Sequence, residues 1–310
     1  MASLAVDLAP GHKTGLNLRN PVMTASGTSS WGFELAKHFG LGGLGALVSK
    51  GITVEPRAGN QQPRVAETPA GMLNSIGLQN VGIGEVIRDL APVWAHWDTP
   101  MIANIAGDSI EEFGSMARRL DGVPGIAAIE LNISCPNVDI GGIEIGQNAE
   151  ASAKATRAAV RNTDLPVIVK LTPNVTDPVA LALAVEEAGA TAICAINTVL
   201  GMRVDLARRR PVLPRARGGL SGPAIKPIAL RIVYDVARAV RIPVIGCGGI
   251  STAEDALEFL MAGATAVQVG TATFANPRAP IDVAEGIEAW LDARKIADIR
   301  EIIGCAMPAA

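Results

Sequence analysis

The sequence predicts an α/β protein whose strands close into a (β/α)8 (TIM) barrel. Eight short apolar runs, typical of buried parallel strands, alternate with helix-like stretches from Pro21 onward. Hydrophobic residues make up 49% of the chain and aromatic residues only 3%, so Ala, Val, Ile and Leu must build the core. Polar residues or glycines follow most of the runs. A doubly wound open sheet is the alternative, and it would also bind ligands at its strand ends.

The elements follow in order. Residues 1–20 form a short N-terminal hairpin around Pro10 and Gly11. The last helix-like stretches carry the clearest signals: Ala229, Val233, Val236 and Val240 make one apolar stripe, and Ser251 with Glu254 has capping-box spacing. The predicted strands are Val22–Ala25, Ala46–Ser49, Met101–Ile105, Ala127–Ile133, Val167–Leu171, Ala192–Asn197, Val244–Gly246 and Ala266–Val269.

Two long insertions, residues 54–80 and 199–222, interrupt this alternation and are predicted as loops at the C-terminal face of the barrel. The second is rich in arginine between residues 203 and 217. Such a cluster can meet a phosphate or an acidic partner, but a solvated loop is favoured.

Composition limits the class of protein. A single domain, residues 1–310, is compatible with a barrel of this length, and a net charge of -3 excludes a strong nucleic-acid footprint. The four cysteines, Cys135, Cys194, Cys247 and Cys305, are too far apart for a zinc or iron–sulfur motif, and we expect no bound metal. No signal peptide or membrane span is evident, so we expect a cytoplasmic protein.

The stretch Glu130–Asn137 is the strongest candidate for a site. Asn132 and Cys135 come where a buried strand should end, and Pro136 stops the strand directly afterwards. Cys135 would therefore sit at the root of an active-site loop, residues 135–148, as a candidate base or nucleophile. On these residues alone, a small buried hydrophobic cysteine is an equally good interpretation.

The other predicted strand ends indicate an anionic ligand. Gly248 with Gly249, and Gly270 with Thr271, follow the last two strands, where barrels often bind phosphate; tight turns are the alternative. Lys50 and Lys170 interrupt apolar segments. Burying an ammonium costs free energy unless an anion binds it or the end of the side chain reaches water. The remaining polar ends are Ser26, Asn104, Asn132, Asn197 and Thr198.

Taken in order, these motifs closely resemble the dihydroorotate dehydrogenases, and within them the NAD-linked class 1B catalytic subunits. The resemblance runs from Pro21 to about Ala275. Its motifs are Met23–Gly27, Ser49–Gly51, Asn74–Asn80, Asn132–Asn137, Lys170–Pro173, Ile196–Thr198, Gly218–Pro223, Gly248–Gly249 and Gly270–Thr271.

The resemblance implies an FMN-dependent barrel that oxidises dihydroorotate to orotate in pyrimidine (UMP) biosynthesis, with Cys135 as the catalytic base. It implies that FMN is held by Ser26, Lys50, Gly51, Asn104, Asn132, Lys170, Ile196, Gly222, Gly248, Gly249, Gly270 and Thr271. It implies that the substrate is held by Lys50, Asn74, Ser75, Ile76, Gly77, Leu78, Asn132, Asn197 and Thr198.

Class 1B resemblance also implies a homodimeric core that assembles with a partner subunit into a heterotetramer. That partner would carry FAD and a [2Fe-2S] cluster and pass electrons to NAD+. The chain itself has no GxGxxG loop and no cysteine cluster. Three alternatives stay open: a fumarate-linked class 1A enzyme, a related flavin barrel that reduces a pyrimidine base, and a phosphate-binding lyase or isomerase without flavin.

Overall fold

A computed structural model describes residues 2–133 and 142–308, and its centre is a closed barrel of eight parallel strands. The sheet order is β3-β16-β15-β10-β9-β8-β7-β4, and a parallel bridge between Met23 and Ala46 joins its two edges. The predicted (β/α)8 barrel is confirmed. The strands are β3 Val22–Thr24, β4 Leu47–Val48, β7 Met101–Ile105, β8 Ala128–Asn132, β9 Val167–Leu171, β10 Ala192–Ala195, β15 Val244–Cys247 and β16 Ala266–Val269.

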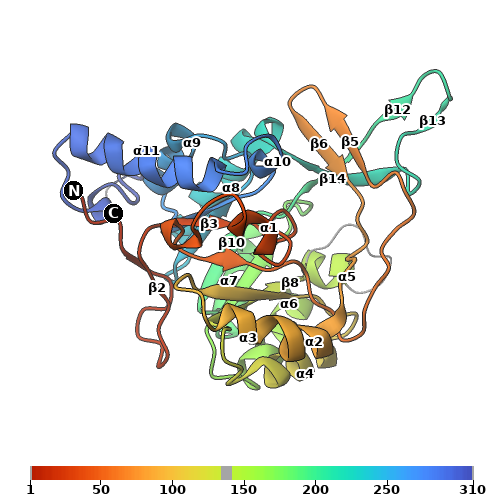
Figure 1. Ribbon diagram of the computed structural model, residues 1–310, viewed down its shortest axis with the longest axis horizontal. Helices are drawn as coiled ribbons and strands as arrows, with labels where there is room; N and C mark the ends of the chain where they lie inside the picture. The colour runs from red at the N-terminus through yellow and green to blue at the C-terminus, as the bar shows by residue number, and fades with distance from the viewer. Residues whose placement is uncertain (1, 134–141, 309–310) are drawn as a thin grey trace.

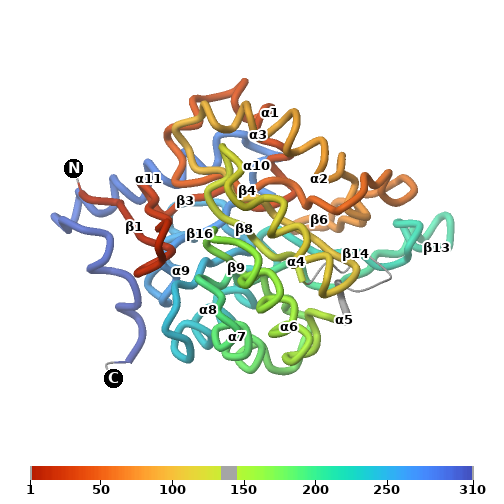
Figure 2. The backbone as a smooth tube through the Cα atoms, turned by 90° about the horizontal axis from the view of Figure 1, so that it is seen from below, coloured from red at the N-terminus to blue at the C-terminus, as the bar shows by residue number. Residues whose placement is uncertain are grey.

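Helices surround these strands, as Figure 2 shows from below, and cover their outer faces. In α8 the predicted apolar stripe is buried against the barrel at Ala229, Val233 and Val236. The main helices are α4 Ile110–Leu120, α6 Ala149–Val160, α7 Pro178–Glu187, α8 Lys226–Ala239, α9 Ala253–Met261 and α11 Ala279–Ala293. The short ones are α1 Phe33–Ala36, η1 Leu41–Gly43, α2 Gly82–Glu85, η2 Val86–Leu90, α3 Ala91–Trp94, α5 Gly142–Gln147, η3 Pro223–Ile225, α10 Ala272–Ala275 and η4 Ile299–Glu301.

The predicted capping box at the start of α9 was wrong by one residue. Thr252, rather than Ser251, is the N-cap, and its hydroxyl accepts a hydrogen bond from the backbone N–H of Asp255 at 3.2 Å. The Asp255 carboxylate accepts from the N–H groups of Thr252 and Ser251 in return. A serine and a threonine side by side offer two candidate caps, and backbone geometry rather than spacing selects between them.

The two insertions predicted as loops contain strands instead. β5 Val65–Thr68 and β6 Gly71–Asn74 come from the first insertion, and β11 Val199–Met202 and β14 Arg217–Ser221 come from the second. They form one antiparallel sheet in the order β11-β14-β6-β5, to one side of the barrel (Figure 1). Each insertion forms its own antiparallel pair, β5 with β6 and β11 with β14, and the pairing of β14 with β6 joins the two pairs into one sheet. The sequence analysis did not predict these strands.

The arginine-rich segment, residues 203–217, contains a strand pair of its own and is not an irregular loop. Its strands β12 Val204–Asp205 and β13 Arg210–Pro211 pair with each other at the upper right of Figure 1. Arg203 donates a hydrogen bond to the backbone carbonyl of Glu67 at 2.6 Å, which ties the segment to the β5–β6 hairpin.

The two ends of the chain lie near each other in Figure 1. β1 Val6–Asp7 pairs with β2 Asn17–Leu18 as an antiparallel hairpin before the barrel begins. Ser3 forms a bridge with Asp298, the N-cap of η4, so the first described residues pair with a segment near the carboxyl end, as the N and C labels of Figure 1 indicate. Within the described residues, no helix has the length and apolar character needed to cross a membrane.

Candidate active site

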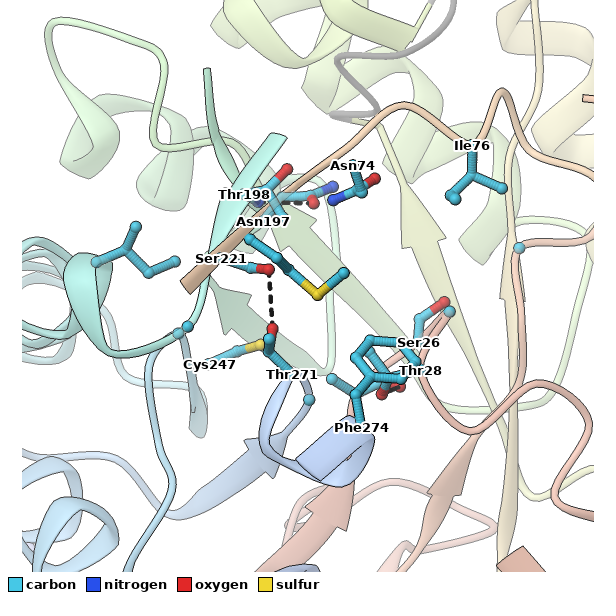
Figure 3. Close-up of a pocket in the computed structure, with 18 of the residues that line it drawn as sticks. Ser26, Thr28, Asn74, Ile76, Asn197, Thr198, Ser221, Cys247, Thr271 and Phe274 are labelled. Carbon is cyan, nitrogen blue, oxygen red and sulfur yellow. Dashed lines mark hydrogen bonds between the residues drawn. The ribbon is translucent and has the colours of Figure 1, made fainter. Parts of the chain in front are cut away.

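A cavity of about 420 Å³ opens at the carboxyl ends of the barrel strands. Its floor consists of strand-end residues, and one wall comes from the antiparallel sheet, including Met72 of β6 and Ser221 of β14 (Figure 3). Parallel strands all end at the same face, so residues far apart in the chain converge there. The two insertions therefore shape the site instead of lying idle on the surface.

The structure brings most of the predicted site residues together around this one cavity. Asn104 and Ser75 are the exceptions among the described residues, and both are buried behind the lining. Cys135 lies outside the described residues, as does the first part of the predicted loop 135–148. The predicted residues that line the cavity are Ser26, Lys50, Gly51, Asn74, Ile76, Gly77, Leu78, Asn132, Lys170, Ile196, Asn197, Thr198, Gly222, Gly248, Gly249, Gly270 and Thr271.

One end of the cavity is built from backbone with little side chain. Gly249 has a φ of 79°, and a Cβ on it would lie 2.8 Å from the backbone nitrogen of Lys226. Gly222 has a φ of 94°, which also favours glycine. Thr271 donates a hydrogen bond to Ser221 at 2.8 Å, which joins the loop after β16 to β14. Exposed N–H groups, two hydroxyls and nearby helix starts suit a phosphate.

The barrel interior below the cavity contains a connected polar network. The Lys170 ammonium donates to Gln268 Oε1 at 2.9 Å, and Gln268 Nε2 donates to Glu130 Oε2 at 2.6 Å. Asn104 Nδ2 donates to the other carboxylate oxygen, Glu130 Oε1, at 2.7 Å. Lys170 Nζ is 3.9 Å from that same oxygen. A buried carboxylate is therefore matched by two amides and one cation.

Lys170 keeps its positive charge although it is buried. Burial alone lowers the pKa of its ammonium, but the neighbouring sulfur atoms of Cys194 and Cys247 and the Glu130 carboxylate outweigh this and raise the pKa above its ordinary value. A cation fixed at the base of the cavity favours a ligand that carries or develops negative charge there.

Lys50 also lines the cavity and is about half-buried. Burial and, secondly, the nearby Arg64 guanidinium lower the pKa of Lys50. An anion bound between Lys50 and the amides would relieve both effects. Those amides include Asn132, which accepts a hydrogen bond from Asn197 at 3.3 Å, and Asn74, which donates to the Gly219 carbonyl at 3.1 Å.

Sequence reasoning did not identify several lining residues. Cys247 lies between glycines in the sequence and was not predicted as a site residue. Its position at the end of β15 could have indicated that it lines the cavity. Ser221 stood within a motif that was noticed for its glycines. Arg64, Val65 and Met72 carried no strand-end signal, because the antiparallel sheet alone brings them to the cavity.

Cys247 is expected to be the more reactive of the two buried barrel thiols. A hydrogen bond from Cys194, together with the Lys170 ammonium, outweighs burial and lowers the pKa of Cys247 to about 7, whereas burial raises the pKa of Cys194. Iodoacetamide labelling of ligand-free protein, mapped by mass spectrometry, should modify Cys247 increasingly between about pH 6 and pH 8 and leave Cys194 unlabelled. Equal labelling of the two residues would contradict this assignment.

Comparisons with known proteins agree with these motifs. The family model described as dihydroorotate dehydrogenase matches residues 11–291. Among curated proteins, "Dihydroorotate dehydrogenase B (NAD(+)), catalytic subunit" of Trichlorobacter lovleyi is 56% identical over 93% of this chain and 95% of its own length. The protein of the same name from Geobacter sulfurreducens is 52% identical, covering 97% of both chains.

The solved structures support the fold. DHODH from Eimeria tenella, determined in complex with ferulenol, superposes with a TM-score of 0.83 over 99% of this chain and 89% of that chain. Its sequence identity is 21%, so this likeness bears on the barrel and not on the site.

Proposed function

We propose that this chain, which belongs to the dihydroorotate dehydrogenase family, uses FMN to oxidise (S)-dihydroorotate to orotate and passes the electrons to a partner subunit. The observation that carries the proposal is the cavity itself. Its glycine-rich end suits a phosphate, and its other end gathers two lysines and several amides in one continuous space. A flavin nucleotide and a small anionic heterocycle have those two chemistries.

The residues present fit FMN. The residues that would hold its phosphate are Gly222, Gly248, Gly249, Gly270 and Thr271. Positions 248 and 249 require glycine, because an added Cβ at either would collide with α8. Towards the barrel axis, Lys170 offers a donor, and Asn104 Oδ1 is a buried acceptor with no hydrogen-bond partner in the described structure. A flavin ring has complementary acceptors and one N–H along its pyrimidine edge. Ser26, Lys50, Gly51, Asn132 and Ile196 would complete the site.

Dihydroorotate would lie against the amide-lined wall. Lys50 would meet its carboxylate, and Asn132, Asn197 and Thr198 would bind its ring. The segment from Asn74 to Leu78, which includes Ser75, Ile76 and Gly77, would cover it. All of these except the buried Ser75 line the same cavity. Amides supply both donors and acceptors, which suits a planar ring with carbonyl and N–H edges.

In the proposed mechanism, Cys135 acts as a thiolate and removes the proton from C5 of dihydroorotate. FMN, when bound, supplies the acceptor for the hydride that leaves C6, and the double bond of orotate remains. Lys170 would supply a positive charge that stabilises the reduced cofactor. Lys50, Asn132, Asn197 and Thr198 would orient the substrate for proton transfer to Cys135.

The names of the curated relatives support a partner. They are called catalytic subunits of an NAD(+)-linked enzyme at 52–56% identity. We propose that a homodimer of this chain assembles with a subunit that carries FAD and a [2Fe-2S] cluster, giving a heterotetramer that reduces NAD+. A red-brown second subunit that co-purifies with the chain would support this, and a stable yellow protein that reduces fumarate unaided would contradict it.

The activity itself can be tested on the isolated, FMN-loaded chain. Under anaerobic conditions, dihydroorotate should bleach the flavin absorbance near ~450 nm, and dihydrouracil, which lacks the carboxylate, should not. Bleaching by dihydrouracil alone would assign the chain to base reduction instead. A chain that takes up no FMN would not be a flavin enzyme.

Replacing Lys50 with methionine should weaken orotate binding by about 10- to 100-fold, the usual effect of removing a charged hydrogen-bonding partner. Titration of the FMN-loaded variant with orotate, followed by the flavin spectrum, would measure this. The pKa of Lys50 is lowered, so its ammonium is lost on raising the pH sooner than that of a free lysine; wild-type binding should therefore weaken at alkaline pH. Lys37→Met, at an exposed position, is the matched control.

A further inference from the structure

Glu130 is fully buried in the barrel, does not line the cavity and has no part in the mechanism above. It nevertheless connects opposite sides of the barrel. Its two carboxylate oxygens accept hydrogen bonds from Asn104 on the neighbouring strand β7 and from Gln268 on β16. In the sheet order, three strands separate β8 from β16, so the side chain of Glu130 spans the interior.

The donors and acceptors of this network have only one consistent arrangement. An ammonium can only donate, so Lys170 fixes Gln268 with its oxygen towards the lysine and its nitrogen towards Glu130. A carboxylate can only accept, so Asn104 must turn its nitrogen towards Glu130. The oxygen of Asn104 is thereby turned the other way.

The side-chain oxygen of Asn104 lacks a hydrogen-bond partner among the described residues, whereas the side-chain nitrogen and both backbone groups of Asn104 have one. The backbone N–H of Asn104 donates to Ser49 Oγ at 3.0 Å, and its carbonyl accepts from Ile52 at 2.8 Å. Asn104 Oδ1 is buried and accepts no hydrogen bond within the described part of the chain. A buried acceptor left without a donor costs free energy, which a bound ligand with an N–H group would recover.

Gly51 lines the cavity and lies next to both Asn104 and Asn132. The point where a Cβ of Gly51 would lie is 3.3 Å from Asn104 Oδ1 and 4.0 Å from Asn132 Nδ2. Asn132 uses its own oxygen to accept from Asn197, so its nitrogen is available as a donor on this side. An acceptor and a donor therefore lie next to Gly51, one of the residues that line the cavity.

We infer that Glu130 is a positioning residue that fixes Asn104 as an acceptor, so that Asn104 Oδ1 and Asn132 Nδ2 together recognise an imide edge, an N–H beside a carbonyl. This inference rests on the proposed function, because both the flavin ring and dihydroorotate carry such an edge. Glu130 touches neither ligand and acts through the amide of Asn104.

A swap of the carboxylate and its amide partner tests the inference. In Glu130→Gln, the new NH2 group must face a donor, either Asn104 Nδ2 or Gln268 Nε2, so one amide has to turn over. Turning Gln268 would point an N–H at the Lys170 ammonium, which can only donate, so we expect Asn104 to turn and the acceptor for the ligand to be lost. In the double variant Glu130→Gln/Gln268→Glu, each pair again has one donor and one acceptor, and the net charge is unchanged.

Two dissociation constants should be measured: that of FMN for the apoprotein, by fluorescence quenching, and that of orotate for the FMN-loaded protein. Glu130→Gln should weaken one of them by about 10- to 100-fold, and the double variant should return it to within about threefold of wild type. The constant that changes identifies whether the flavin or the substrate supplies the imide. Asn104→Leu should show the same loss.

Other outcomes overturn the inference. A double variant that binds no better than Glu130→Gln would show that donor direction is irrelevant, and full affinity in Asn104→Leu would show that the acceptor is unused. If Glu130→Gln does not fold, circular dichroism and binding of the double variant decide, because it must fold and bind. Wild-type protein that binds neither ligand would overturn the proposed function as well, whereas a failed swap overturns only the role of Glu130.

Discussion

Replacing Cys135 with alanine should slow the reduction of bound FMN by dihydroorotate by about 10²-fold or more, while FMN binding stays intact. The reason is that a positioned base contributes roughly 10²- to 10⁴-fold to a proton transfer. The residues proposed to hold the phosphate, Gly222, Gly248, Gly249, Gly270 and Thr271, come from other parts of the chain. Anaerobic stopped-flow measurement of flavin bleaching isolates this step from re-oxidation by any acceptor.

Serine at the same position provides a graded comparison. Cys135→Ser should be slow near neutral pH and partly recover at high pH, because a hydroxyl is far less acidic than a thiol, whose ordinary pKa is ~8.5, and therefore stays protonated near neutrality. Cys305→Ala is the matched control, since it removes an exposed thiol far from the cavity lining. An unchanged rate of flavin reduction in Cys135→Ala would refute its role as the base.

Replacing Lys170 with methionine should lower the free energy of unfolding by about 3–5 kcal/mol. The substitution leaves the Glu130 carboxylate buried without its cation, and removing one partner from a buried pair has that typical cost. Urea unfolding of the apoprotein, followed by circular dichroism, measures the effect without a contribution from bound FMN. The FMN-loaded variant should also lose its cofactor more readily.

The pH dependence of this contribution has a definite sign. The pKa of Lys170 is raised in the folded protein, so its stabilising contribution is fully present below the ordinary lysine value and is lost only as the pH rises through the folded value. Lys154→Met is the control, because Lys154 pairs with Glu150 on the surface, where such pairs contribute little. Equal stabilities of the two variants would show that Glu130 does not depend on Lys170.

The barrel and most of the cavity lining could be predicted from the sequence because both depend on local signals. Apolar runs such as Val167–Leu171 form strands wherever they occur in a parallel sheet, and the residues that end them must meet at one face. Lys50, Asn132 and Thr271 are identified in this way from the sequence alone. The identity of the family followed from motifs in a fixed order along the chain.

Only the tertiary structure decided which side chains satisfy one another. The sheet β11-β14-β6-β5 joins two insertions more than a hundred residues apart through the pairing of β14 with β6. No local pattern indicates that pairing, so Arg64 and Met72 could not be placed at the cavity from the sequence. Asn104 was predicted as a ligand residue, but which of its two amide atoms is bonded to Glu130 could only be seen in the structure. Hydrogen-bond direction inside a barrel depends on donors and acceptors from several strands at once, and a linear pattern does not contain that information.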